Sequence, residues 1–200
     1  MQYTDVTPEK ITCLFVKFGE GDEKAFSFFY KYFMNDLYAY GRSLGATEAH
    51  VMDAVQDVFV NVFFDKPQLK SVEHFKYFLL KSLKNRLYDL FKSKSFSEAT
   101  DIGGEALSFS IKTTVLDEII EEEDRIIIEQ KIEKLLSVLS PLQKEALYLR
   151  YIQGLEYSEI SGMMDRSEVS IRKLVSQAII KIRKENQILP MVVFVAMLYG

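Results

Sequence analysis

The segment from Gly154 to Lys184 has the pattern of a short helix, a tight turn and a longer helix. Asp165 and Arg166 fall at the turn, where Asp tolerates a left-handed backbone better than most residues. Ser167 comes next and can cap the second helix by accepting a backbone N–H bond. Apolar residues then recur at spacings of four, three and four, which predicts one buried stripe. The apolar stripe comprises Ile171, Val175, Ala178 and Ile182.

Polar and basic side chains occupy the other faces of this longer helix. A helix-turn-helix needs this division, because one face packs on the partner helix while the other enters the major groove. The competing interpretation is a helical hairpin whose basic face is simply solvated. The residues on the polar faces are Arg172, Lys173, Ser176, Gln177 and Lys181.

Basic residues are concentrated in two islands, although the chain as a whole carries a net charge of −4. Six basic residues and one acidic residue lie between Lys76 and Lys94, and the same numbers hold between Arg166 and Lys184. Six acidic residues fall within residues 117–124. Because the local field sets the attraction of a polyanion, the islands predict two separate contacts with nucleic acid.

The single cysteine, Cys13, excludes an internal disulfide and fits a reducing cytoplasm. Its apolar neighbours predict a buried structural thiol. No basic-then-apolar signal begins the sequence. The run from Ile188 to Tyr199 has 12 residues, whereas a membrane-spanning helix needs about 20. We expect a cytoplasmic protein whose apolar C-terminal tail, Met191–Gly200, packs on the chain or on a partner.

Helix signals run through nearly the whole chain, and no alternation argues for a sheet, so we expect an all-α protein. Thr7, Asp22, Thr47 and Ser71 stand where a side chain can cap a following helix. These four helices can close a first core of about ninety residues, which is within the usual domain range.

The chain divides into two small helical domains. Ser93–Thr114 is rich in serine and threonine and contains a glycine pair, which is typical of a flexible linker. A second helical block begins near Leu116, and Ser140-Pro141 starts a further helix. We therefore expect domains at residues 1–94 and 116–200, joined by a flexible linker at residues 95–115.

No constellation of residues supports an enzyme. His50 and His74 lie outside any metal-ligand pattern. Asp53 and Asp57 share a helix face, but without a second acid–base partner they are interpreted as a solvated or partner-facing edge. No serine stands in a nucleophile-elbow pattern. We expect no catalytic residue, no metal ion, no cofactor and no small-molecule substrate.

Four segments in this order resemble the bacterial RNA polymerase sigma factors of the extracytoplasmic-function (ECF) group. DEKAFSFFYKYFMNDLYAYGRSL, from Asp22, resembles the opening helix of sigma region 2. DAVQDVFVNVF, from Asp53, is similar to the core-polymerase-binding helix, and FLLKSLKNRLYDLFKS, from Phe78, to the promoter-melting segment. LSPLQKEALYLRYIQGLEYSEI, from Leu139, resembles the first part of region 4. Asp165 departs from the family, which usually has glycine at the turn.

The resemblance implies a region 2 bundle and a region 4 helix-turn-helix that direct promoter recognition, DNA melting and transcription initiation. It implies core RNA polymerase, promoter DNA and an anti-sigma factor as partners. The implied core-polymerase-binding residues are Asp53, Gln56, Asp57 and Phe59, with Phe59 contributing if its face is exposed. The implied −10 residues are Lys81, Lys84, Asn85, Arg86, Asp89 and Lys92. The implied −35 residues are Ser167, Ser170, Arg172, Lys173, Gln177 and Lys181.

Two other classes of protein share parts of this pattern. A conventional helix-turn-helix regulator, with N-terminal helices for sensing or dimerisation, would bind duplex DNA alone, usually as a dimer over two half-sites. A protein-binding helical scaffold would show none of the steep salt dependence that phosphate contacts produce.

Overall fold

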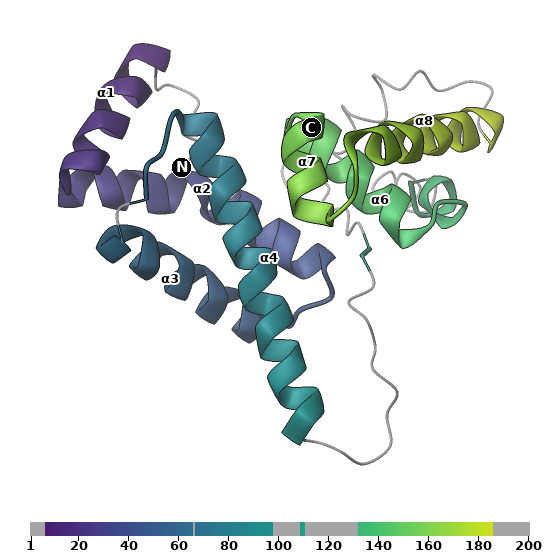
Figure 1. Cartoon of the computed structure of the whole chain (residues 1–200), viewed down its shortest axis with the longest axis horizontal. Coiled ribbons are helices and arrows are strands. Elements are labelled where there is room, and N and C mark those ends of the chain that lie inside the picture. The colour runs from purple at the N-terminus through teal and green to yellow at the C-terminus, as the bar shows by residue number, and fades with distance from the viewer. Residues whose placement is uncertain (1–6, 66, 98–108, 111–131, 186–200) are drawn as a thin grey trace, which may run out of the picture. The chain divides into compact units, whose positions relative to one another are not determined.

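The computed structural model describes residues 7–65, 67–97, 109–110 and 132–185. Within these ranges every regular element is helical and none is a strand, which confirms the all-α expectation (Figure 1). The chain forms two compact units, Met1–Leu107 and Ser108–Gly200. In the described part of the chain no helix combines the length and apolar character needed to cross a membrane.

The described residues of the first unit form four helices, and each begins at the cap expected from the sequence. They are α1 (Pro8–Glu20), α2 (Glu23–Ser43), α3 (Glu48–Asp65) and α4 (Val72–Ser97). The Thr7 hydroxyl accepts from the Lys10 N–H, and the Asp22 carboxylate accepts from the Ala25 N–H. The hydroxyls of Thr47 and Ser71 accept from backbone N–H groups three residues later in the same way. These caps satisfy donors that the first helical turn leaves without partners.

An aromatic and aliphatic core holds α2, α3 and α4 together. Phe29, Phe33 and Phe75 pack edge to face and stacked within it, with ring centroids 5.4 to 5.9 Å apart. At Gly41 the α2 backbone approaches α3 so closely that an added Cβ would lie 2.8 Å from Cγ1 of Val51. The absence of a side chain at Gly41 therefore sets the spacing of these two helices.

The second unit is built around the helix-turn-helix. Residues 132–137 are helical, and they are followed by α6 (Pro141–Leu147), the π-helical turn η1 (Tyr148–Ile152), α7 (Tyr157–Met164) and α8 (Glu168–Glu185). α6 and α7 both pack against α8. Asp165 ends α7 in the left-handed conformation, with φ 55° and ψ 45°, which confirms the sequence-based expectation for the turn. The expected stripe of α8 is buried: Ile171, Val175, Ala178 and Ile182 are all at most 8% exposed.

One sequence-based expectation is wrong, and two others fall on segments that the structure does not describe. Cys13 is exposed, so the predicted buried thiol is wrong. Its helix α1 turns Phe15 and Phe18 toward the rings of Phe29 and Phe75 and leaves Cys13 on an outer face. The apolar tail, Met191–Gly200, and most of the expected linker lie outside the described residues.

Phe109 is a described residue of the expected linker, and it packs with the second unit. Its ring centroid lies 5.4 Å from that of Tyr148, and Phe109 is 3% exposed. The helical path of α4 also continues to Ser97, beyond the expected start of the linker at residue 95.

Candidate nucleic-acid interface

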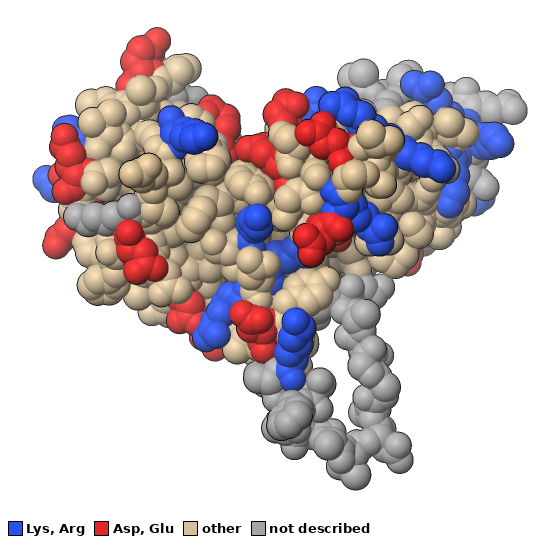
Figure 2. Space-filling model, in the orientation of Figure 1, with Lys and Arg blue, Asp and Glu red and all other residues tan. Residues whose placement is uncertain are grey.

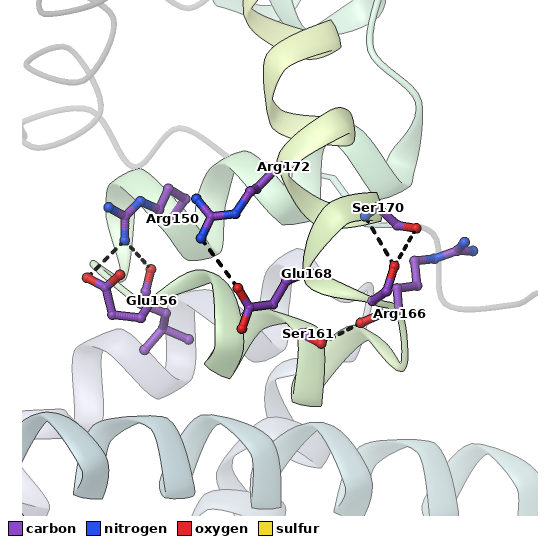
Figure 3. A network of polar contacts seen from close by, with 9 residues as sticks. Arg150, Glu156, Ser161, Arg166, Glu168, Ser170 and Arg172 are labelled. Atoms are coloured by element: carbon purple, nitrogen blue, oxygen red, sulfur yellow. Dashed lines mark hydrogen bonds and ion pairs between the residues drawn. The ribbon is translucent and has the colours of Figure 1, made fainter.

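The N-terminus of α8 presents two serines side by side. The Ser167 hydroxyl accepts from the Ser170 backbone N–H at 3.3 Å and lies 2.9 Å from the Ser170 hydroxyl (Figure 3). Both residues are exposed. Ser167 is thus the expected cap, and the pair offers hydroxyl groups at the end of the helix that a helix-turn-helix directs into the major groove.

Arg172 projects from the exposed side of α8, and its guanidinium contacts both a carboxylate and an aromatic ring. Nη2 of Arg172 pairs with Glu168 at 3.3 Å, one turn earlier, and the guanidinium carbon lies 4.2 Å from the Tyr157 ring centroid. Its side chain remains 59% exposed. Lys173 and Gln177 are exposed as well. Figure 2 shows blue side chains along α8, which is yellow-green in Figure 1.

Arg150 and Tyr157 complete this arrangement, and neither was predicted from the sequence. Arg150 lies in η1, and its guanidinium carbon is 4.8 Å from the centroid of the same Tyr157 ring. Its Nη1 donates to the Leu155 carbonyl at 2.8 Å and pairs with Glu156 at 3.2 Å (Figure 3). The only available signal was an arginine and a tyrosine seven residues apart on either side of Gly154, which does not predict a π-helical turn.

Burial raises the pKa of Tyr151 above the ordinary value of a tyrosine, and the neighbouring Tyr157 adds to this effect. The positive charges of Arg150 and Arg183 act in the opposite direction. Tyr151 therefore keeps its proton in this cationic region of the second unit.

Lys181, a predicted DNA contact, makes internal hydrogen bonds in this structure. Its Nζ donates to the Val138 carbonyl at 3.2 Å and to Oε1 of Gln143 at 3.0 Å. Gln143 also forms the capping box with Ser140 at the start of α6. The Lys181 ammonium thus joins α8 to the chain entering α6. Its predicted DNA contact stays a prediction.

One face of α4 carries a stripe of basic, amide and aromatic side chains. Lys81, Asn85, Tyr88 and Lys92 follow one another at spacings of four, three and four, which places them on one side of the helix. Asn85 and Lys92 are exposed, and Tyr88 is 37% exposed. Asp89, also exposed, borders this stripe. The combination of cationic groups and an accessible ring suits a single strand with unstacked bases.

Two of the predicted −10 residues, Lys84 and Arg86, lie outside the exposed stripe of α4. Lys84 is 9% exposed, and its Nζ lies 5.8 Å from the Tyr88 ring centroid. Arg86 lies on a different side of α4 and pairs with Asp57 of α3 at 2.7 Å. The sequence assigned both by charge, whereas the packing of α4 turns Lys84 inward and Arg86 toward α3. Their predicted −10 contacts stay predictions, and either contact would require the side chain to leave these surroundings.

The predicted polymerase-binding helix, α3, exposes part of its polar edge. Asp53 and Gln56 are exposed, and Asp57 is partly exposed in its pair with Arg86. Phe59 is 1% exposed, with its ring 4.9 Å from that of Tyr30. The condition attached to Phe59, an exposed face, is not met, because α2 covers it. Within the described residues no group of His, Cys, Asp and Glu is arranged to hold a metal ion.

The helix-turn-helix region matches a known protein family, and the fold resembles solved structures. Residues 129–182 match the family described as sigma-70, region 4. Of the solved structures, CnrH in complex with the cytosolic domain of CnrY has a TM-score of 0.54 and 18% identity, over 86% of this chain and 94% of that one. The sigma factor RpoE, in complex with the anti-sigma factor NepR from Bartonella quintana, has a TM-score of 0.54 and 19% identity, over 81% and 98%. No curated protein sequence matches the chain. These findings confirm the region 4 resemblance and the all-α fold.

Proposed function

We propose that this chain, whose residues 129–182 match sigma-70 region 4, is a sigma factor of the ECF group that directs core RNA polymerase to promoters. The observation that carries the proposal is the coincidence of that match with an exposed cationic face on α8. This face is the surface that a helix-turn-helix presents to duplex DNA. The likeness in fold to the sigma factor RpoE supports the same function for the whole chain.

In this proposal α8 reads the −35 element. Arg172 is suited to a bidentate contact with guanine, which gives about 1–3 kcal/mol of discrimination. Lys173 and Gln177 are exposed on the same helix and are available for phosphate or base contacts. Ser167 and Ser170 lie at the start of α8 and can contact the DNA backbone.

The stripe on α4 binds the opened −10 element. Lys81 and Lys92 attract phosphates, and Asn85 can hydrogen-bond a base or the backbone. Tyr88 offers a ring face on which an unpaired base can stack. Extruding a base costs a few kcal/mol of stacking, and these contacts together with polymerase binding offset it.

The exposed edge of α3 supports contact with core polymerase through Asp53 and Gln56. Asp57 contributes once its pair with Arg86 rearranges or accepts a second cationic partner. Residues 1–94 then act as a region 2-like domain, residues 95–115 as the linker and residues 116–200 as the region 4-like domain. The mechanism needs no catalytic residue and no cofactor.

We also propose that the protein acts in the cytoplasm and that an anti-sigma factor holds it inactive. This partner is proposed because RpoE was solved with the anti-sigma factor NepR. The polymerase and promoter partners follow from the region 4 match.

Co-elution with purified core RNA polymerase tests the proposal against a conventional helix-turn-helix regulator. We expect the full chain to co-elute with core polymerase and to retain promoter fragments only in that complex. Asp53→Asn and Gln56→Ala should weaken co-elution, while Glu9→Gln, on α1, serves as the matched control. If the chain does not bind core polymerase but binds duplex DNA by itself, the result supports a conventional helix-turn-helix regulator instead.

A further inference from the structure

Two guanidinium groups lie over the ring of Tyr157, and they come from different elements. Arg150 of η1 lies 4.8 Å from the ring centroid, and Arg172 of α8 lies 4.2 Å from it. Tyr157 is the first residue of α7, so the ring links the π-helical turn, the first helix of the motif and the recognition helix. Such a stack favours arginine, because its planar, weakly hydrated cation fits an aromatic face.

Arg150 holds one side of this arrangement in place. Its Nη1 donates to the Leu155 carbonyl at 2.8 Å and pairs with Glu156 at 3.2 Å, and its side chain is only 28% exposed. A guanidinium with these partners restricts the ring that it stacks on. Tyr157 is therefore a fixed platform, and Arg172 also lies over its ring.

Arg172 contacts the Tyr157 ring, and its own side chain remains accessible to a ligand. Glu168 pairs with one nitrogen, and the Tyr157 ring supports the flat of the guanidinium. The side chain is nevertheless 59% exposed. An exposed arginine ordinarily samples many rotamers, and binding must then overcome the loss of that freedom. Pre-ordering the group before binding removes part of this loss.

We propose that Tyr157 is a positioning residue that pre-orders Arg172 to read one guanine in the −35 element. The inference rests on the proposed function of α8. Arg172 makes the base contact, and Tyr157 acts through it without touching the base. A bidentate Arg–guanine contact requires both nitrogens of one edge to face the base edge, so it depends on the plane of the guanidinium. A phosphate contact is less demanding in this respect.

The test uses the full chain bound to core RNA polymerase and a promoter library in which the −35 element is randomised. Four proteins are compared: wild type, Arg172→Ala, Tyr157→Phe and Tyr157→Leu. Arg172→Ala identifies the base position that Arg172 reads. Tyr157→Phe keeps the ring, and Tyr157→Leu removes it while preserving apolar volume.

We expect Tyr157→Leu to reduce the base preference at that same position by about two- to fivefold, the range of a cation–π contact at an exposed site. Tyr157→Phe should retain the preference of the wild type. If Tyr157→Leu keeps the wild-type preference, or weakens binding equally for all sequences, the positioning role is overturned. If the wild type yields no promoter-dependent selection at all, the proposed function itself fails.

A second measurement on the wild-type chain keeps the inference testable if Tyr157→Leu does not fold. The Hδ protons of Arg172 should show an upfield ring-current shift in the NMR spectrum, and its Nε–Hε group should be more ordered than that of Arg183. Unshifted protons and equal mobility would overturn the proposal.

Discussion

The Arg86 guanidinium on α4 grips a single carboxylate oxygen of Asp57 on α3, through Nε at 2.8 Å and Nη2 at 2.7 Å. Both side chains are nearly half exposed, at 44% and 46%. The pair joins the helix proposed for polymerase binding to the helix proposed for the −10 element.

Asp57→Asn should lower the free energy of unfolding of the first unit by about 0.5–1 kcal/mol, the range of a well-formed surface ion pair. Hydrogen exchange of α3 and α4 peptides measures this change locally. The difference should shrink at high salt, because exposed charges are screened. Asp53→Asn, on the same helix, is the matched control and should change the free energy by no more than about 0.5 kcal/mol. Equal effects of the two substitutions would contradict the assignment.

Gly41→Ala should destabilise the first unit by about 1–3 kcal/mol, because the new methyl group would overlap the side chain of Val51. Urea unfolding followed by circular dichroism measures this loss. Gly19→Ala, in α1, meets nothing within 4 Å and should stabilise by about 0.5–1 kcal/mol. Opposite signs for two identical substitutions provide the test, and adding Val51→Ala to Gly41→Ala should restore part of the loss.

The positive φ of Asp165 predicts an order of stability among substitutions at the turn. Asp165→Gly should match the wild type or exceed it, since glycine adopts this conformation without steric strain. Asp165→Ala should cost about 1 kcal/mol, because a Cβ without a local hydrogen-bonding group is unfavourable there. Thermal unfolding of the second unit ranks the three proteins, and equal values for alanine and glycine would refute the argument.

Lys181 and Lys173 should separate stability from DNA affinity. Lys181→Met removes hydrogen bonds to Val138 and Gln143 and should lower the stability of the second unit by about 1 kcal/mol or more. Lys173→Met should leave stability within about 0.5 kcal/mol but weaken promoter binding and reduce its salt dependence. The reverse pattern would mean that Lys181 is the DNA contact and Lys173 the structural one.

The raised pKa of Tyr151 predicts a loss of stability at alkaline pH. The folded protein holds this proton more tightly than the unfolded chain, chiefly because of burial. The contribution is therefore complete below the ordinary tyrosine pKa of 10.0 and is lost as the pH rises through the folded value. Tyr151→Phe should make stability fall less steeply above that pH. Difference absorbance of tyrosinate between the two proteins should show a group that ionises late, and an ordinary titration would contradict this.

Local signals in the sequence predicted the helices well. Thr7, Asp22, Thr47 and Ser71 each cap the helix expected after them, and Ser167 caps α8. These outcomes follow from residues close in sequence, because a cap bonds a backbone group only three positions away. The α8 stripe succeeded for the related reason that the helical period fixes which side chains share a face.

Side chains whose environment depends on a neighbouring helix were harder to predict. Phe59 of α3 is buried because the rings of Phe26 and Tyr30 of α2 pack against it. Lys84 and Arg86 were assigned by charge, but packing decides which of them is exposed.

The contacts of Arg150 and Arg172 with the Tyr157 ring were also hard to predict, because they depend on neighbouring elements. They also depend on a π-helical turn whose signature, the hydrogen bond from Gln153 N–H to the Tyr148 carbonyl, leaves no simple residue pattern. Periodicity therefore located the recognition helix but not the contacts that orient its arginine.

Transcription from pooled genomic fragments with purified core RNA polymerase tests the central claim most directly. The account predicts new transcripts only when this chain is added, with start sites that align to two shared upstream elements. Substituting Lys81 or Asn85 should impair the nearer element, and substituting Arg172 should impair the farther one. Identical transcript sets with and without the chain, at concentrations where it is folded, would contradict the account.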